Sequence, residues 1–263
     1  MRIIGVIDLK DGQGVHARGG RRNEYAPVAE AAGTVINGDA VKLAGVYRES
    51  FGLTDIYVAD LDAIGSAVGR GPDKVSATTT NVDVVRSICR LGGNVIVDSG
   101  VATLDEAHRV AAAGAHEVIV GLETLPSFDV LRDICRHYSV TFSLDLRNGI
   151  PMNSAELMGA SPEDLAREAV AAGTKAIIVL DVARVGGTAG PDTEMLSRIR
   201  RVVAGAALLV GGGVRGLDDL NLISRLGCDG ALVATALHNG RLTASDVLPS
   251  NAGSAWSGPT RPL

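Results

Sequence analysis

Short apolar runs alternate with longer amphipathic segments along the whole chain. Eight runs are rich in Val, Ile, Leu and Ala and carry few charges. Their length and composition are typical of strands that are buried on both faces of a parallel sheet. The runs cover residues 3–9, 55–61, 94–100, 117–121, 140–146, 176–182, 207–213 and 230–236.

The segments between these runs have the apolar spacing of helices. In four of them Ser, Thr or Asp precedes the first turn or Gly follows the last, at 82–92, 103–115, 161–174 and 215–227. Alternation repeated eight times predicts an α/β fold with one closed (β/α)8 TIM barrel over residues 1–248. Residues 249–263, rich in Pro, Gly and Ser, are expected to form a flexible tail.

The chain also repeats itself. At an offset of 113, residues 98–125 match residues 211–238 at six positions, including Gly100/Gly213 and Gly114/Gly227, where chance gives about two. Earlier in the chain IGVIDL pairs with TFSLDL, and YVADLD pairs with IVLDVA. The repeat predicts two half-barrels, about 1–125 and 126–248, related by a pseudo-twofold axis.

Two carboxylates stand at equivalent places in these halves. Asp8 ends the first apolar run and Asp145 ends the fifth. An ionised carboxylate in the mouth of a barrel is costly to desolvate unless it is paired or used, although either one could instead cap a helix or hold a loop. Their equivalence favours a catalytic pair, a general base and a general acid with pKa values pushed apart.

The expected phosphate site lies in the C-terminal half. Gly212 and Gly213 follow the seventh run, and Ala234 and Thr235 end the eighth, which is where barrels present free backbone amides to a phosphate. The triple glycine could also be only a tight turn. The matching N-terminal segments, 98–100 and 121–124, carry two carboxylates that would repel a phosphate dianion, so one phosphate is expected unless arginines intervene.

Two connections are unusually long, residues 10–40 and 62–79, and long loops at the carboxyl ends of barrel strands tend to carry function. The first contains Arg18, Arg21 and Arg22, which could clamp an anion or could form a solvated basic loop. His16 in the same loop is interpreted as a bystander. The other predicted substrate-binding residues are Lys10, Asp60, Asp98, Arg147, Asp181 and Thr188.

Charge and composition limit the classes of molecule that the protein is expected to bind. A formal net charge of −5 gives no basic face for nucleic acid. The three cysteines lack metal-like spacing, and no metal or cofactor is expected. The N-terminus lacks a signal-peptide core and no run reaches the roughly 18 apolar residues of a membrane span, so a cytoplasmic protein is expected. The expected ligand is a small phosphorylated metabolite, and the sequence leaves a homo-oligomer open.

The sequence as a whole resembles the histidine-biosynthesis barrels. These are ProFAR isomerase and the related cyclase, imidazole glycerol phosphate synthase. The resemblance spans about residues 1–240 and lies in VIDLKDGQGV, SLDLRNG, DVARVGGTAGPD, VGGGVRGLDDL and LVATAL. It implies that Asp8 and Asp145 are the acid–base pair of an aldose–ketose isomerisation. Two positions depart from the ProFAR isomerase pattern: Leu180 replaces a threonine, and 98–100 replaces a glycine-rich phosphate motif.

The pieces VIDLKDG, GGRRNEYAPV and IYVADLDAI are more similar to a branch related to ProFAR isomerase. That branch is associated with methanogens and with bacteria that use tetrahydromethanopterin and methanofuran. Three hypotheses follow. The first is an isomerase-type enzyme that acts by acid–base catalysis on a metabolite with one phosphate, in the biosynthesis of the one-carbon cofactors tetrahydromethanopterin or methanofuran. The second is an authentic ProFAR isomerase that uses Arg18, Arg21 or Arg22 for a second phosphate, and the third is a non-catalytic barrel that binds a phosphometabolite or a partner enzyme.

Overall fold

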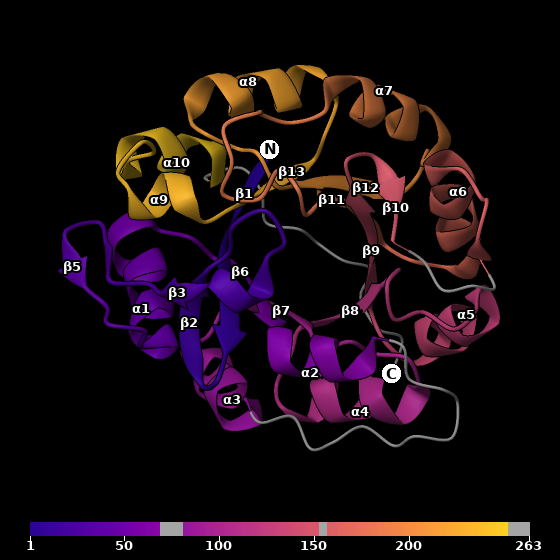
Figure 1. Cartoon of the computed structure of the whole chain (residues 1–263), viewed down its shortest axis with the longest axis horizontal. Coiled ribbons are helices and arrows are strands. Elements are labelled where there is room, and N and C mark those ends of the chain that lie inside the picture. Colours follow the sequence, from indigo (N-terminus) through magenta and orange to yellow (C-terminus); the bar gives the residue numbers. More distant parts are fainter. Residues whose placement is uncertain (69–80, 153–156, 252–263) are drawn as a thin grey trace.

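The chain folds into a closed eight-stranded parallel barrel surrounded by helices, as the alternation predicts (Figure 1). The computed structural model describes residues 1–68, 81–152 and 157–251. The barrel strands follow one another around the ring and the last pairs with the first, which closes the sheet. They are β1 (Arg2–Lys10), β6 (Asp55–Asp60), β7 (Asn94–Asp98), β8 (Glu117–Gly121), β9 (Val140–Arg147), β11 (Ala176–Asp181), β12 (Ala207–Gly211) and β13 (Gly230–Val233).

Helices cover the outside of this sheet. They are α1 (Ala40–Phe51), α2 (Leu61–Ala67), α3 (Val82–Arg90), α4 (Leu104–Ala112), α5 (Phe128–His137), α6 (Pro162–Ala172), α7 (Thr193–Val202), α8 (Leu217–Arg225), α9 (Thr235–His238) and α10 (Ala244–Asn251). The expected caps are present on α4, where the Thr103 hydroxyl accepts from an N–H, and on α6, which runs from the Ser161 cap to left-handed Gly173.

Period-two alternation divides each strand between two cores. On β1, Ile3 and Ile7 belong to the core between sheet and helices, whereas Ile4 packs in a second core with the inward side chains of the other strands. Asp8 has the parity of Ile4, so alternation directs it inward at the carboxyl end of the strand. The alternation of side chains along β1 thus places the Asp8 carboxyl group in the barrel mouth.

Hairpins continue β1 and β9 beyond the barrel. β2 (Gln13–His16) pairs antiparallel with β1, and β10 (Ile150–Pro151) pairs antiparallel with β9. Each turn has two residues with positive φ, Asp11–Gly12 and Asn148–Gly149, at equivalent places in the two halves. Positive φ at both central residues is the geometry of a type I′ hairpin, which Asp-Gly and Asn-Gly favour.

The long connection 10–40 is therefore more ordered than an irregular loop. After β2 it contains a 3-10 turn, η1 (Arg22–Glu24), and three short strands, β3 (Ala26–Pro27), β4 (Glu30–Ala31) and β5 (Thr34–Val35). The second long connection begins as α2, and residues 69–79 lie outside the described part of the chain.

Three expected strand ends need correction. The run 94–100 ends as a strand at Asp98, and Gly100 adopts a positive φ of 67°. The run 230–236 ends as a strand at Val233 because helix α9 starts at Thr235. The run 207–213 ends at Gly211, since Gly212 and Gly213 adopt positive φ values of 84° and 82° that leave the strand geometry. The tail expected from 249 starts within α10, and residues 252–263 are outside the described ranges. No helix in those ranges is both long and apolar enough to cross a membrane.

Gly5 on β1 provides a test of how tightly the sheet meets helix α1. A Cβ at this position would lie 2.5 Å from the Tyr47 ring and 3.0 Å from Leu53, both buried. We expect Gly5→Ala to lower the free energy of unfolding by about 1–3 kcal/mol through overpacking. Gly45→Ala is the matched control, because its Cβ meets nothing within 4 Å inside α1, and a gain of about 0.5–1 kcal/mol is expected. Urea unfolding measures both, and equal stability of the two variants would contradict this packing.

Candidate functional site

A cavity of about 560 Å³ lies at the barrel mouth. Residues from both halves line it, together with the first long loop. Ten of the fifteen predicted catalytic, phosphate-binding and substrate-binding residues lie in its wall: Asp8, Arg21, Arg22, Asp98, Asp145, Arg147, Gly212, Gly213, Ala234 and Thr235. The structure therefore brings both predicted catalytic residues and all four predicted phosphate-binding residues to one space. Their roles stay predictions.

The pKa values of the two predicted catalytic aspartates are raised to near neutral pH. Burial raises the pKa of Asp8 to about 7, although the charge of Arg22 lowers it. Burial raises the pKa of Asp145 to about 8, and the charges of Asp98 and Glu123 push it in the same direction. Asp145 is 4% exposed, and its two oxygens accept from the Ser143 hydroxyl at 2.6 Å and the Glu123 N–H at 3.3 Å.

A third carboxyl group, Asp98, shares the same space. Burial raises its pKa to about 6, partly offset by hydrogen bonds from the Gly100 N–H and the Tyr57 hydroxyl. Gly121 lies between the strands of the two acids, and a Cβ there would be 2.9 Å from Asp145 Oδ2 and 3.7 Å from Asp98 Oδ2. Since Gly121 places no side chain between them, the charge of Asp98 raises the pKa of Asp145. Among the described residues no group of three His, Cys, Asp or Glu is arranged to hold a metal ion.

Arg22 is the arginine of the first loop that reaches these acids. Its guanidinium donates to Glu123 Oε1 at 2.5 Å, with side chains 33% and 13% exposed. Burial alone would lower the pKa of Arg22, but Glu123 and Asp98 raise it above its ordinary value. Arg21 instead pairs with Glu24 at the exposed rim. Of the three candidate arginines, Arg22 is thus the one that compensates buried negative charge.

The two halves use equivalent backbone amides differently. In the C-terminal half the N–H groups of Gly213 and Ala236 have no acceptor among the described residues. The corresponding N-terminal groups, at the offset of 113, belong to Gly100 and Glu123. They donate to the carboxylates of Asp98 and Asp145. One half keeps its amides open to an anion, and in the other the protein's own carboxylates occupy them.

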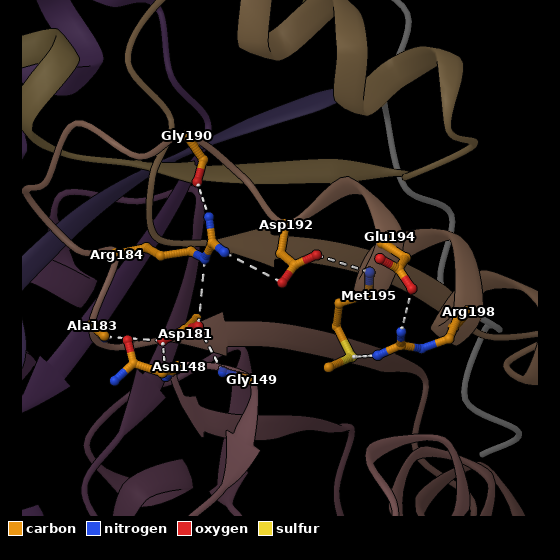
Figure 2. Close-up of polar contacts among 10 residues, drawn as sticks. All are labelled: Asn148, Gly149, Asp181, Ala183, Arg184, Gly190, Asp192, Glu194, Met195 and Arg198. Atoms are coloured by element: carbon orange, nitrogen blue, oxygen red, sulfur yellow. Dashed lines mark hydrogen bonds and ion pairs between the residues drawn. The ribbon is translucent and has the colours of Figure 1, made fainter.

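Asp181, a predicted substrate-binding residue, does not line the cavity and instead supports the second hairpin. Its carboxylate accepts from the N–H groups of Asn148, Gly149 and Ala183 and pairs with Arg184 (Figure 2). Arg184 extends the network to the Gly190 carbonyl and to Asp192. The carboxylate therefore fixes the turn that follows the Asp145 strand.

Asp60 has the equivalent position in the first half and a similar role. It accepts from Asn81 Nδ2 at 2.7 Å, and Asn81 in turn accepts from the Gly12 N–H of the first hairpin turn. Asp62 accepts from the Asp11 N–H of the same turn. Neither Asp60 nor Asp181 borders the cavity, so this geometry gives both a supporting role and leaves direct substrate contact without support.

Three more predicted substrate-binding residues lie away from the cavity wall. Lys10 is in the first hairpin, Arg18 is exposed, and Thr188 is exposed in the loop after β11. The loop that carries Arg18 crosses the mouth to the other half, where the Gly19 N–H donates to the Val185 carbonyl. The first loop therefore covers the cavity, although only some of its charged residues face it.

A hydrogen-bonded chain that runs from buried Tyr47 to His238 and His16 in the cavity wall was not predicted from the sequence. The Tyr47 hydroxyl donates to the Val6 carbonyl at 2.8 Å, so its contact of 2.6 Å with His238 Nε2 must use the imidazole proton. His238 Nδ1 then accepts from His16 Nε2 at 3.1 Å. Burial lowers the pKa of His238 to about 3, which keeps it neutral. His16, interpreted as a bystander, is held in one tautomer by a contact that spans 222 positions and leaves no local signal in the sequence.

Stability as a function of pH tests the raised pKa of half-buried Asp8. Between about pH 4 and 7 the folded chain holds the Asp8 proton more tightly than the unfolded chain, so the stability from this group falls as pH rises. Asp8→Asn cannot ionise. We expect the variant and the wild type to be equally stable near pH 4 and the variant to be more stable by on the order of 1–3 kcal/mol above pH 7. Denaturant unfolding at several pH values checks this, and a pH-independent difference would contradict it.

Comparison with known proteins identifies relatives that align with nearly the whole barrel. The family described as "Histidine biosynthesis protein" matches residues 2–243. An uncharacterised protein of Methanocaldococcus jannaschii is 31% identical over 94% of this chain and 98% of its own. ProFAR isomerases of Streptococcus thermophilus and of an Anaeromyxobacter strain are 27% and 29% identical, over 92% and 96% of this chain and 96% and 100% of theirs. The match over nearly the whole barrel shows that the chain belongs to the histidine biosynthesis protein family.

Proposed function

We propose that the protein is an isomerase-type enzyme that performs acid–base catalysis on a small metabolite carrying one phosphate. The observation that supports this most directly is that two carboxyl groups, half-buried Asp8 and buried Asp145, line one cavity and have pKa values raised to about 7 and 8. Groups that titrate near the working pH exchange protons most effectively. Membership in a family that includes ProFAR isomerases supports the same class of reaction.

The surroundings of the two aspartates assign one as the general acid and the other as the general base. Asp145, with the higher pKa and two carboxylate neighbours, holds a proton at neutral pH and acts as the general acid on a substrate oxygen. Asp8, half ionised near pH 7, removes the proton from the adjacent carbon. Asp8 returns this proton to the neighbouring carbon, and Asp145 recovers a proton from the hydroxyl group that becomes the new carbonyl. The step therefore moves a proton and a double bond within one molecule without a net change of oxidation state.

The phosphate is assigned to the C-terminal half. The open amides of Gly213 and Ala236 lie beside the predicted phosphate-binding residues Gly212, Ala234 and Thr235. Anchoring a non-reacting phosphate there would fix the reacting carbons between the two strands that carry the aspartates. The finer assignment, to biosynthesis of tetrahydromethanopterin or methanofuran, is supported only by the sequence resemblance and by the similarity to the Methanocaldococcus jannaschii protein.

Authentic ProFAR isomerase is the second candidate, since relatives with that name align over nearly the full chain. It needs a second anion site, and the residue nearest to providing one is Arg22, which is already bonded to Glu123. Complementation of a histidine auxotroph separates the two candidates: growth supports ProFAR isomerase, and no growth supports the proposal.

Substitution of the two aspartates tests the chemistry. The metabolite that accumulates when the gene is deleted is incubated with the wild type, Asp8→Asn and Asp145→Asn. We expect each variant to lose about 10²–10⁴-fold in turnover, because each removes one proton-transfer group. Both should remain folded and bind inorganic phosphate as the wild type does.

Retention of pathway function by both variants would overturn the enzymatic proposal. It would support the alternative of a barrel that binds a phosphometabolite or a partner enzyme without catalysis. Loss of phosphate binding together with turnover would instead indicate misfolding, which circular dichroism of the same preparations detects.

A further inference from the structure

The N-terminal end of the cavity is built as an anion site that the protein fills itself. Its two amides, at Gly100 and Glu123, are satisfied by the carboxylates of Asp98 and Asp145. Arg22, which could attract a ligand anion to this end, is bonded to the Glu123 carboxylate. These two amides and Arg22 are thus already bonded to carboxyl groups of the chain.

The two halves carry different side chains at the position of Glu123, and this difference changes the charge at the N-terminal end of the cavity. Its equivalent in the C-terminal half is Ala236, whose N–H has no acceptor in the described part of the chain. The Glu123 side chain is only 13% exposed and lines the cavity, so its charge acts at short range with little screening by solvent. Asp98 adds a second negative charge beside the same arginine.

We propose that Glu123 determines substrate specificity by occupying the second anion position and holding Arg22 in an internal ion pair. The substrate class is then a metabolite with a phosphate at one end only, whose other end is uncharged or basic. A phosphate dianion at this end would have to compete with Glu123 for Arg22 while facing Asp98. The inference rests on the proposed function for the phosphate at the opposite end.

Removal of the Glu123 carboxylate is therefore expected to create a second anion site. Glu123→Ala gives this position the side chain of its C-terminal equivalent and leaves Arg22 without its carboxylate partner. Crystals of wild type and variant are soaked in the same series of inorganic phosphate concentrations, and the occupancy of each ion is refined. We expect one ion in the wild type, near Gly213, and a second in the variant, on Arg22, with at least tenfold tighter binding there than in the wild type.

Two further variants show where the effect comes from. Arg22→Gln combined with Glu123→Ala should lose the second ion, because its positive partner is gone. Glu24→Gln is the matched control on the same loop: it frees Arg21, which is 66% exposed, and should bind no second ion. If Glu123→Ala does not fold, Glu123→Gln removes the charge while keeping the volume, and a second ion on Arg22 is expected there too.

The outcomes separate this inference from the proposed function. One ion in both proteins, or two in the wild type, would overturn the role of Glu123. No ion near Gly213 in either protein, with an ion on Arg22 only in the variant, would support the role of Glu123 and refute the phosphate site of the proposed function.

Discussion

Burial of carboxyl groups in the top layer of the barrel is the constraint on which the rest of the site depends. Strand parity sends Asp8, Asp98 and Asp145 inward, and a closed sheet offers them little water. The protein meets this cost in two ways: the pKa values rise until protons are retained near neutrality, and Arg22 compensates part of the remaining charge. The same burial that costs stability makes the acids useful for proton transfer.

The sequence alone predicted the barrel and the position of those residues that follow from the alternation of side chains along a strand. Alternation in the first and fifth runs places Asp8 and Asp145 at the mouth, and the structure agrees. The same rule, applied strictly, would have excluded two predicted substrate-binding residues. Ala59 and Leu180 pack in the inner core, so Asp60 and Asp181, one position later, have the opposite parity.

Other features could not be derived from one sequence. Three arginines lie within five positions of the first loop, and only the fold shows that Arg22 meets Glu123, 101 positions away. The chain from Tyr47 through His238 to His16 is similarly non-local. In contrast, the Asp-Gly and Asn-Gly turns after β1 and β9 are local signals that predict hairpins directly. Such signals could have shown that the first connection does not start as an irregular loop.

The two half-barrels share their supports and differ in their ligand-facing groups. In each half a carboxylate at the end of the second strand helps to hold a type I′ turn next to the strand that carries Asp8 or Asp145. In the second half that carboxylate, Asp181, also holds Arg184 in the loop after β11, and this loop receives the Gly19 N–H of the first connection. The support in one half therefore helps to position the loop that delivers Arg22 to the other. The difference in charge between the two sides of the barrel mouth thus rests on hairpin supports that both halves share.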